Sequence, residues 1–281
     1  MRSGKLREEM DLKRSIEDFD LVFLDLETTG LDVITGDAIC EIGAFKVRGR
    51  KTIDKFHSLI NPKKSMPREA YLIHGINDEE LKDAPYFNEV ADRLLSFLGD
   101  CTICAYNAKF DMGFLEFELK RIEYPSLGLF AIDILGMVRK TLKLPKNNLG
   151  AIAQFFEIKS PNGLHRALDD AFVASRIFFK VKDIIKEKKL ENLEDFISLY
   201  GLNNEVFKLK EEPKIFLIKE AIVNGAAIKA RYFSCDNVVV EEKIKPVKLS
   251  QENKNFYLWC HSPQGQVLRI RLNRIFEVEI A

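Results

Sequence analysis

An apolar run that ends in two acidic residues constrains the fold of this chain more than any other segment. Residues 21–27, LVFLDLE, show no alternation of polar and apolar positions, which is typical of a strand covered on both faces. The segments 38–49 and 51–60 do alternate and are separated by a Gly-containing turn, so they predict a hairpin. Strands and helices then follow one another up to about residue 185. We therefore expect an α/β domain built on a mixed sheet.

Helical patterns and a later change of pattern predict the remaining organisation. Apolar residues at helical spacing predict helices at 87–99, 110–122 and 167–185. Residues 186–212 are rich in charge and contain one expected helix, and we interpret them as a connector. In residues 213–281 one helix is followed by short alternating strands with turn residues between them, which favours a small β-barrel or curled sheet.

Composition excludes several classes of protein. The 281 residues suffice for one large domain and one small domain. Lys and Arg number 43 and Asp and Glu number 43, so no overall positive charge indicates a protein that merely coats nucleic acid. No apolar run approaches the roughly 20 residues of a membrane span. The N-terminal segment lacks the apolar core of a signal peptide, so we expect a cytoplasmic protein without a membrane partner.

The five cysteines are scattered along the chain: Cys40, Cys101, Cys104, Cys235 and Cys260. An odd and scattered set argues against a disulfide framework. Cys101 and Cys104 form a C-x-x-C, but the run CTICAY predicts a strand that points the two thiols to opposite faces. We therefore expect core packing for these thiols rather than a zinc or redox site.

Acidic residues lie at the ends of the predicted elements. Asp25 and Glu27 are two residues apart at the end of a strand, so both project from one face, where neighbouring carboxylates repel each other and lose hydration. Divalent cations or nearby basic groups would compensate; the alternative is a strand end in water. Asp111 falls in the first turn of a helix, where the alternative is an acid that complements the helix dipole, with Asn107 as the capping residue.

The segment 165–171, HRALDDA, adds a third acidic position and a histidine. Asp170 lies on a stripe of alanines that lets a helix approach a sheet closely, whereas Asp169 points about 100° away and is expected in solvent. A charge on a packed stripe is costly unless it is paired or binds a cation. His165 alone would be an ordinary surface residue, but beside these acids its imidazole is suited to act as a base at neutral pH.

Three separate segments therefore offer hard oxygen ligands together with one histidine. Such ligands suit Mg²⁺ or Mn²⁺, which keep coordination positions for water and for phosphate oxygens. Two such ions can activate a water molecule and stabilise the leaving oxygen of a phosphodiester. The pattern predicts a metal site with this chemistry.

Four motifs in this order resemble those of the DnaQ-like exonucleases, the histidine branch of the DEDD superfamily, which includes the proofreading subunits of bacterial replicative polymerases. The motifs are DLETTGL, IHGIND, YNAKFD and HRALDDA, and the match extends over about residues 19–185. The resemblance implies a ribonuclease-H-like fold. It also implies a two-metal 3′→5′ exonuclease that uses Mg²⁺ or Mn²⁺ and releases nucleoside monophosphates from single-stranded nucleic acid, with DNA favoured.

The same resemblance assigns roles to individual residues. It implies four metal ligands and a general base, which are Asp25, Glu27, Asp111, Asp170 and His165. It implies substrate contacts in three places, which are Thr28, Thr29 and Leu31 in the first turn, His74, Gly75 and Ile76 in a loop, and Asn107 and Phe110 around the second acidic motif. Tyr106 is a departure, because many relatives have histidine there, but this position is not a ligand.

The C-terminal residues 213–281 resemble the WYL domain, a small Sm-like β-barrel of bacterial regulators. Phe256, Tyr257 and Leu258 stand for its Trp-Tyr-Leu signature, and RIRLNRI for its arginine-rich last strand. Residues 214–281 contain eleven Lys and Arg against seven Asp and Glu, a net charge of +4. We expect nucleic-acid contacts from the tyrosines and arginines of this domain, and the alternative is a solvated face of a structural barrel. The candidates are Tyr232, Tyr257, Arg269, Arg271 and Arg274.

Two other functions remain alternatives. A non-catalytic sensor would read a nucleic acid or nucleotide with the C-terminal domain, but the presence of all four acids and the histidine favours an enzyme. An exoribonuclease is not distinguished from a DNA exonuclease, because that choice depends on contacts to the 2′-hydroxyl group. The sequence also leaves open whether the protein acts alone or with a DNA polymerase, and it does not indicate an oligomeric state.

Overall fold

The computed structural model describes residues 11–33, 36–124, 127, 129–186, 190–202, 217–234, 238–252 and 255–280. The chain forms two compact units, which are described separately. The first unit consists of Met1–Ile184 and Glu191–Leu202, and the second of Ile185–Leu190 and Asn203–Ala281.

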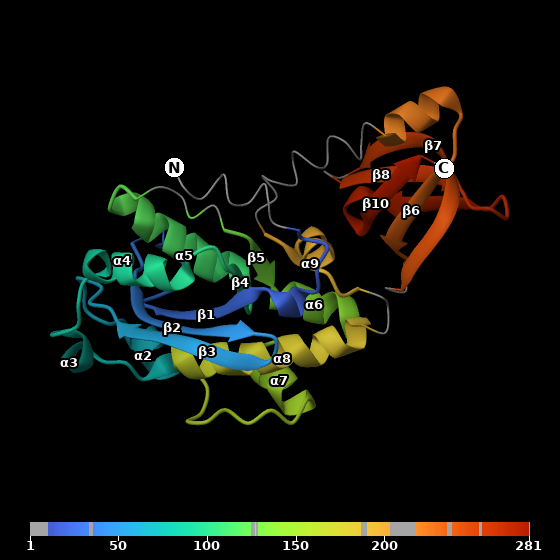
Figure 1. The fold of residues 1–281 in the computed structure, drawn as a ribbon. Helices are drawn as coiled ribbons and strands as arrows, with labels where there is room; N and C mark the ends of the chain where they lie inside the picture. Colours follow the sequence, from blue (N-terminus) through green and yellow to red (C-terminus); the bar gives the residue numbers. More distant parts are fainter. Residues whose placement is uncertain are drawn as a thin grey trace. The chain divides into compact units, whose positions relative to one another are not determined.

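A five-stranded mixed sheet with the strand order β3-β2-β1-β4-β5 forms the centre of the first unit (Figure 1). Its strands are β1 (Asp20–Thr28), β2 (Ile39–Arg48), β3 (Lys51–Leu59), β4 (Thr102–Ala105) and β5 (Ala131–Asp133). The first three strands pair antiparallel, whereas β4 pairs parallel with β1 and β5 parallel with β4. The predicted hairpin and the α/β class of the fold are confirmed.

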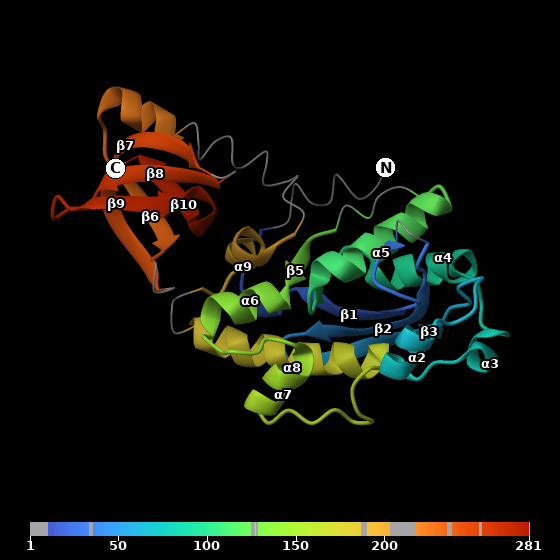
Figure 2. The same cartoon turned by 180° about the vertical axis from the view of Figure 1, so that it is seen from behind.

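Helices cover both faces of this sheet, with α4 (Phe87–Leu98) and α5 (Ala108–Arg121) on one side and α8 (Ala167–Lys186) on the other (Figures 1 and 2). Alternate residues of β1 account for this. Val22 and its even-numbered neighbours pack into a core with α4 and α5. The ring of Phe23 instead contacts Phe178 of α8, at 5.3 Å between centroids. Because both faces are covered, the sequence of β1 is a continuous apolar run up to its acidic residues.

Smaller helices complete the first unit. They are α2 (Arg68–His74), α3 (Asp78–Leu81), α6 (Ile134–Thr141), α7 (Leu149–Phe155) and α9 (Leu193–Tyr200), with a 3₁₀ turn at Ile16–Asp18. The helix expected in the connector, α9, belongs to this unit, because the backbone nitrogen of Leu202 donates to the oxygen of Ala131 on β5 at 2.8 Å. Other connector residues, 187–189 and 203–212, lie outside the described residues.

The cysteines that the structure describes are buried free thiols. Cys104 lies on β4 and Cys101 directly before that strand. Burial raises the pKa of both thiols. A protonated thiol is a poor metal ligand and a poor nucleophile, so this geometry agrees with core packing. Cys235 lies outside the described residues.

The second unit contains one antiparallel sheet with the strand order β10-β6-β7-β8-β9. The strands are β6 (Ile228–Phe233), β7 (Val239–Glu252), β8 (Asn255–His261), β9 (Val267–Arg271) and β10 (Ile275–Ile280). Residues 217–224 are helical, and Ile218 and Ala221 pack into the core of this sheet. Among the described residues no strand pairing joins β9 to β10. A 3₁₀ turn at Leu272–Arg274 separates these strands, so the expected barrel is seen only as a sheet.

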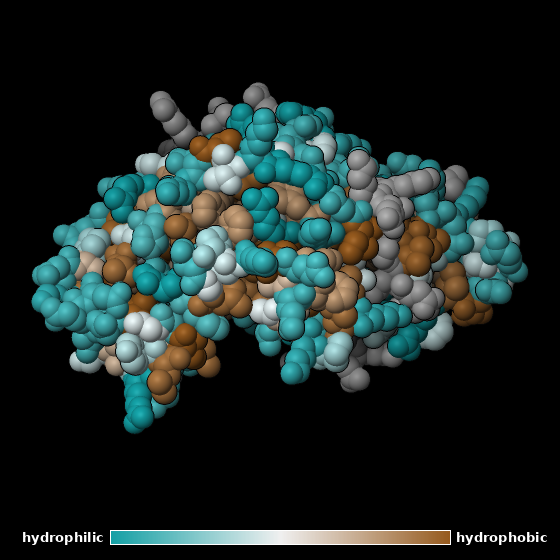
Figure 3. Space-filling model, turned by 90° about the horizontal axis from the view of Figure 1, so that it is seen from below, coloured by the Kyte–Doolittle hydropathy of each residue, from teal (hydrophilic) through white to brown (hydrophobic). Residues whose placement is uncertain are grey.

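The surface of the described residues is mixed in character. No helix in this part of the chain has the length and apolar content to cross a membrane. On the face drawn in Figure 3, hydrophobic residues form separate groups among hydrophilic ones. Leu31 and Leu72 are among the most exposed large apolar side chains, with 83% and 70% of their surface accessible.

Candidate active site

Three carboxylates converge between β1 and the first turn of α8. Asp25 and Glu27 share the face of β1 that carries Phe23, and this face is covered by α8. Asp170 lies in the first turn of α8. One oxygen from each of the three side chains lies within 4.8 Å of the others. The structure therefore brings together two of the acidic segments that the sequence singled out.

Gly43 allows α8 to lie this close to the sheet. It pairs with Asp25 across β1 and β2. A Cβ atom on Gly43 would lie 2.2 Å from the backbone nitrogen of Leu168 and 2.3 Å from the carbonyl carbon of Ala167. Because a side chain there would collide with helix backbone, only glycine fits. The first turn of α8 can therefore bring Asp170 up to the strand that carries Asp25.

Asp111 reaches the same region from α5, which begins just after β4. Its Oδ1 accepts a hydrogen bond from the backbone nitrogen of Leu26, the residue between the two acids of β1, at 3.1 Å. The residue is only 2% exposed. Asn107 precedes α5 with φ at 69°, and its side chain makes no capping hydrogen bond. The expected capping by the Asn107 side chain is therefore wrong, and Asp111 is a buried acid in the first turn of α5.

Burial, together with the charges of neighbouring acids, raises the pKa values of all four carboxyl groups. Loss of hydration is the largest cause in each case. The pKa rises to about 8 for Glu27, to about 8 for Asp111 and to about 6 for Asp170. The pKa of Asp25 is raised well above its ordinary value by burial and then by the charges of Asp111 and Asp170. Such a cluster of oxygen donors fits a hard divalent cation, which would stabilise the ionised forms.

Glu41 and Arg166 anchor the start of α8. Glu41 is fully buried and pairs with Glu27 across the two strands. It accepts hydrogen bonds from Arg166 Nη2 at 2.8 Å, from the backbone nitrogen of Ala167 at 2.9 Å and from His57 Nε2 at 2.7 Å. Burial alone would raise the pKa of Glu41, but these hydrogen bonds and the charge of Arg166 hold it at about 2. The ion pair therefore ties β2 to the helix that carries Asp170.

His165 lies at the surface in the turn that enters α8. Its φ is 72°, a left-handed conformation that is uncommon for a residue with a side chain. Its backbone nitrogen donates to Oδ1 of Asp170 at 3.1 Å, and the next residue, Arg166, is held by Glu41. Backbone of this kind persists where surrounding contacts hold it, which is frequent at functional sites. The turn thus places an exposed histidine directly beside one of the three clustered acids.

Asp169 corrects one expectation about this helix. It is 9% exposed rather than in solvent, and its Oδ1 accepts hydrogen bonds from the backbone nitrogen of Asn162 at 3.3 Å and from its Nδ2 at 3.2 Å. The loop before α8 folds over this side of the helix, which helical periodicity does not predict. Asp169 therefore holds that loop in place. The predicted alanine stripe is buried as expected, at Ala167, Ala171 and Ala174.

The turn after β1 uses its two threonines internally. The hydroxyl of Thr28 donates to the carbonyl oxygen of Gly30 at 2.6 Å, and the hydroxyl of Thr29 accepts from the backbone nitrogen of Ala38 at 3.0 Å. Both threonines are buried, whereas Leu31 is the exposed residue of this turn. Of the three candidates, only Leu31 therefore presents its side chain freely to a substrate.

His74 and Ile76 also differ from the expectation. They are 6% and 0% exposed. The backbone nitrogen of Ile76 donates to Nδ1 of His74 at 3.0 Å, and Nε2 of His74 lies 4.0 Å from the sulfur of Cys40. Burial lowers the pKa of His74. Because α2 ends at Gly75 with a left-handed φ of 72°, the chain turns both side chains inward, and their contact with a substrate stays a prediction.

The residues around the second acidic motif have different surroundings. Asn107 is exposed, and Phe110 is partly buried with its ring 4.9 Å from that of Phe114. The hydroxyl of Tyr106 donates to the carbonyl oxygen of Asn147 at 2.7 Å. Asn107 therefore offers its side chain to solvent beside Asp111, and Tyr106 has a structural contact.

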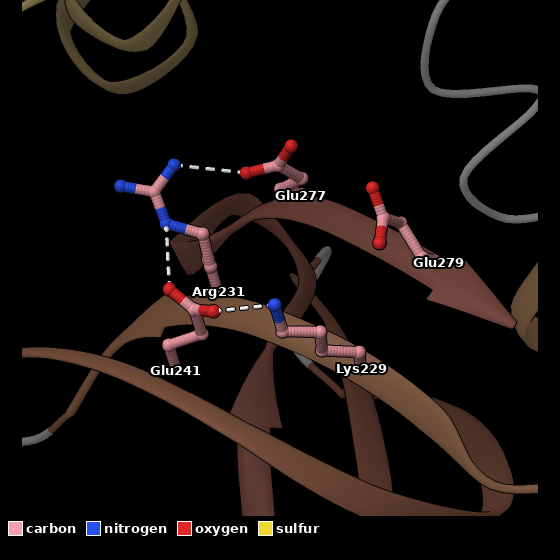
Figure 4. Close-up of a pocket in the computed structure, with 5 residues that line it drawn as sticks. All are labelled: Lys229, Arg231, Glu241, Glu277 and Glu279. Carbon is pink, nitrogen blue, oxygen red and sulfur yellow. Dashed lines mark hydrogen bonds and ion pairs between the residues drawn. The ribbon is translucent and has the colours of Figure 1, made fainter. Parts of the chain in front are cut away.

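A pocket on the second unit is lined by charges that pair with one another (Figure 4). Arg231 lies 2.8 Å from Glu277 and 3.7 Å from Glu241, and Lys229 lies 2.6 Å from Glu241. These ion pairs join β10, β6 and β7, and Glu279 completes the lining. We interpret the pocket as an ion-pair network of the sheet rather than as a binding site.

Two of the candidate contacts in the second unit are structural. Tyr232 is 6% exposed, and its hydroxyl donates to Glu242, so it does not present a ring for stacking. Nε of Arg274 donates to the carbonyl oxygen of Phe233 at 3.1 Å, and its Nη2 to that of Ser234. The other three candidates, Tyr257, Arg269 and Arg271, lie on β8 and β9, away from the core.

The raised pKa values predict how stability responds to pH and metal. Carboxyl groups of an unfolded chain titrate near 4, whereas Glu27, Asp111 and Asp170 titrate at about 8, 8 and 6 in the fold. Between about pH 4 and these raised pKa values the folded state binds more protons than the unfolded state does. The free energy of unfolding in EDTA therefore falls as the pH rises. A divalent cation binds the ionised forms, so Mg²⁺ is expected to raise the Tm near pH 8 and much less at about pH 5. Thermal unfolding at both pH values checks this, and an equal Mg²⁺ effect at both would contradict it.

Known proteins resemble this chain in sequence and in fold. The exonuclease family model of the RNase T type matches residues 22–178. The DNA polymerase III subunit epsilon of Rickettsia conorii is 39% identical over 242 residues, which is 84% of this chain and 94% of that protein. That of Rickettsia felis is 42% identical over 166 residues, which is 57% of this chain and 72% of that protein. Because the first unit ends at Leu202, the longer alignment extends into the second unit.

A solved structure shares the fold. Exonuclease I of E. coli, in complex with a dA16 oligonucleotide, superposes with a TM-score of 0.54 and 16% identity, covering 87% of this chain and 55% of that chain. At this identity the likeness concerns the fold alone, which is the ribonuclease-H-like exonuclease fold expected from the motifs. The family match spans more than half of the chain and includes both the β1 acids and Asp170. The chain therefore belongs to the exonuclease family, as a DnaQ-like hydrolase similar to the epsilon subunit of DNA polymerase III.

Proposed function

We propose that the first unit hydrolyses phosphodiester bonds at the 3′ end of single-stranded nucleic acid and releases nucleoside monophosphates. The observation that carries this proposal is the convergence of Asp25, Glu27 and Asp170 within 4.8 Å. Buried Asp111 lies beside the first two, and exposed His165 beside the third. A cluster that unites so many carboxylates with one solvent-facing imidazole is suited to metal-assisted hydrolysis.

Asp25, Glu27 and Asp170 would hold divalent cations, with Asp111 as a further donor near Asp25. We propose two Mg²⁺ or Mn²⁺ ions, because all the donors are hard oxygens and no thiol joins them among the described residues. Bound ions of this kind lower the pKa of water and stabilise charge on phosphate oxygens.

The chain's own residues supply the proton transfer and the geometry. His165 takes a proton from the attacking water, because its turn lies at the solvent side of the acids and its backbone is bound to Asp170. Glu41, through Arg166 and the nitrogen of Ala167, keeps that turn in place. Leu31 and Asn107 are exposed beside the acidic motifs, and we propose that they contact the terminal nucleotide.

The relatives support a DNA substrate and a polymerase partner. The Rickettsia proteins are named as subunits of DNA polymerase III, and one of them aligns with 84% of this chain. We propose that this protein likewise acts in DNA replication or repair, in the cytoplasm and with a DNA polymerase as its partner. We further propose residues 19–185 as the catalytic domain, 186–212 as a connector whose helix α9 packs on the first unit, and 213–281 as an Sm-like domain of the WYL type.

Digestion of a 5′-labelled strand tests the activity and its polarity. A 3′→5′ exonuclease shortens the labelled strand stepwise, whereas attack from the other end releases the label at once as a mononucleotide. We expect stepwise shortening with Mg²⁺ or Mn²⁺ and none with EDTA. A DNA strand and an RNA strand of one sequence, compared by kcat/KM, decide between a DNA exonuclease and an exoribonuclease. Intact strands under all metal conditions would leave the sensor as the better hypothesis.

A further inference from the structure

The outer face of β7, β8 and β9 carries a regular array of basic and aromatic side chains, which we call the basic aromatic face. It consists of Lys248, Tyr257, Trp259, Arg269 and Arg271. Strand pairing places Lys248, Trp259 and Arg269 side by side in one row across the three strands. The next row contains Ser250, Tyr257 and Arg271. Because alternate residues of a strand share a face, both rows lie on the same side of the sheet.

The opposite side of these strands packs into the core of the second unit, so the basic aromatic face points outward. Leu258 and Ile270, which alternate with the residues of the face, are 0% and 5% exposed and belong to the core of the second unit. Lys248, Arg269 and Arg271 are exposed, and the two rings are half-buried. The chain therefore keeps two aromatic rings at the surface, where a purely structural sheet would not require them.

The rings and the cations of the face are already in contact. The guanidinium carbon of Arg269 lies 4.3 Å from the ring centroid of Tyr257 and 5.7 Å from that of Trp259. Nζ of Lys248 lies 5.4 Å from the Trp259 ring. The indole nitrogen of Trp259 donates to the hydroxyl of Ser250 at 3.0 Å, which fixes the plane of the ring. Cation–π contacts of this kind hold the long basic side chains over the rings, so rings and charges are presented together.

Acidic and basic side chains are unevenly distributed along the sequence of the second unit. No Asp or Glu occurs from 255 to 276, a stretch that contains β8, β9 and three arginines. In the pocket of Figure 4, Glu241 of β7 pairs with Lys229 and Glu277 of β10 pairs with Arg231. The basic aromatic face itself carries three positive charges, from Lys248, Arg269 and Arg271.

We propose that the basic aromatic face binds single-stranded nucleic acid, with bases stacked on Trp259 and Tyr257 and phosphates bound by Lys248, Arg269 and Arg271. Stacking requires bases that are not paired, which selects a single strand over a duplex. The cations that lie over the rings match a backbone that carries one negative charge per nucleotide. This binding does not depend on the hydrolysis proposed for the first unit. The face would hold the strand at a second place, apart from its 3′ end.

Trp259 provides a local signal for the test, because it is the only tryptophan of the chain. The full-length protein in EDTA, where no hydrolysis is expected, is titrated with an oligothymidylate, and the tryptophan fluorescence is recorded. Stacking of a base on the indole is expected to quench this fluorescence in a saturable way. A parallel titration with an RNA strand of the same length shows whether both kinds of strand bind. Fluorescence that stays constant while a labelled strand binds elsewhere would overturn the proposal.

Variants of the face test the roles of its charges and rings by the anisotropy of a labelled strand. Arg269→Ala with Arg271→Ala is expected to reduce the slope of log affinity against log salt by about 1.4, since each lost phosphate contact removes about 0.7 for single strands. Lys229→Ala with Lys243→Ala removes the same charge from neighbouring strands of this unit and serves as the matched control. Tyr257→Ala is expected to weaken binding about 10-fold, whereas Tyr257→Phe retains the ring and most of the affinity.

The outcomes separate this proposal from the exonuclease activity. An arginine double variant that matches the lysine control in affinity and salt slope would overturn the proposal, and the face would then serve a protein or another ligand. Both double variants are expected to digest a very short strand at the unaltered rate, because neither changes a residue of the first unit. A protein whose tryptophan fluorescence is quenched by the oligothymidylate as expected, but which digests no strand in Mg²⁺ or Mn²⁺, would instead refute the exonuclease proposal. The proposed binding face would then stand.

Discussion

Asp25→Asn and Asp170→Asn are each expected to abolish nuclease activity, to the level seen in EDTA, without unfolding the protein. Each change removes one charged ligand from a cluster whose oxygens lie within 4.8 Å of one another, and it leaves the side-chain volume almost unchanged. Burial raises the pKa of both acids, so ionisation of these acids destabilises the folded protein when no metal is bound. The Tm in EDTA near pH 8 is therefore expected to stay equal or to rise in both variants.

Two measurements check this expectation together. Digestion of a labelled strand reports activity, and the increase in Tm caused by Mg²⁺ reports metal binding, which both variants are expected to lose in large part. Asp20→Asn is the matched control on the same strand, because Asp20 at the start of β1 forms an ion pair with exposed Arg48. Full activity in either variant would refute the proposed ligands. A fall in Tm that accompanies the loss of activity would instead indicate a structural role.

The positions of the proposed catalytic acids could be predicted because local pattern determines them. The two-residue spacing of Asp25 and Glu27 places both on one face of any strand, whatever that strand packs against. Asp170 lies on an alanine stripe, so the packed face of its helix is also visible in the sequence. The order of strands and helices up to about residue 185 follows from the same periodicities. Periodicity alone does not show which acids lie close together in the fold. The four motifs supply that information.

Burial of polar side chains could not be predicted, because it depends on segments that are distant in sequence. Asp169 is covered by the loop of Asn162, and Tyr232 is turned into the core of its sheet. His74 of helix α2 lies in the core beside Cys40 of strand β2. In each case the local pattern is compatible with exposure. Only the packing of other elements decides the outcome.

The anchoring of α8 was also missed, although the sequence contains a signal for it. Glu41 and Gly43 interrupt the buried strand β2 on the face toward the active site, opposite Glu27 and Asp25. A lone acid and a glycine at alternate positions of a buried strand indicate an ion pair and a close approach of backbone. Neither residue identifies its partner, because Arg166 is 125 positions from Glu41. The tertiary structure was needed to show that the pair fixes the turn of His165.

His165→Ala is expected to lower kcat by about 10² to 10⁴, the range that a positioned general base contributes. The turn places this histidine beside Asp170 at the solvent side of the acids, so its removal takes away the proton acceptor and leaves the carboxylates in place. KM and the Mg²⁺-induced increase in Tm are therefore expected to change little. His261→Ala, on β8 of the second unit, is the control for the loss of an imidazole elsewhere in the chain.

The pH dependence of the residual rate distinguishes a base from a positioning role. In the unaltered enzyme kcat is expected to fall on the acidic side, where an imidazole base becomes protonated. In His165→Ala that imidazole contribution is absent, so the fall is expected to shift to lower pH or to disappear, with metal binding as the remaining pH-dependent step. A reduced rate with the same acidic limb would contradict the role of base. His165 would then act by holding the turn against Asp170, and the bound metal or another group would accept the proton.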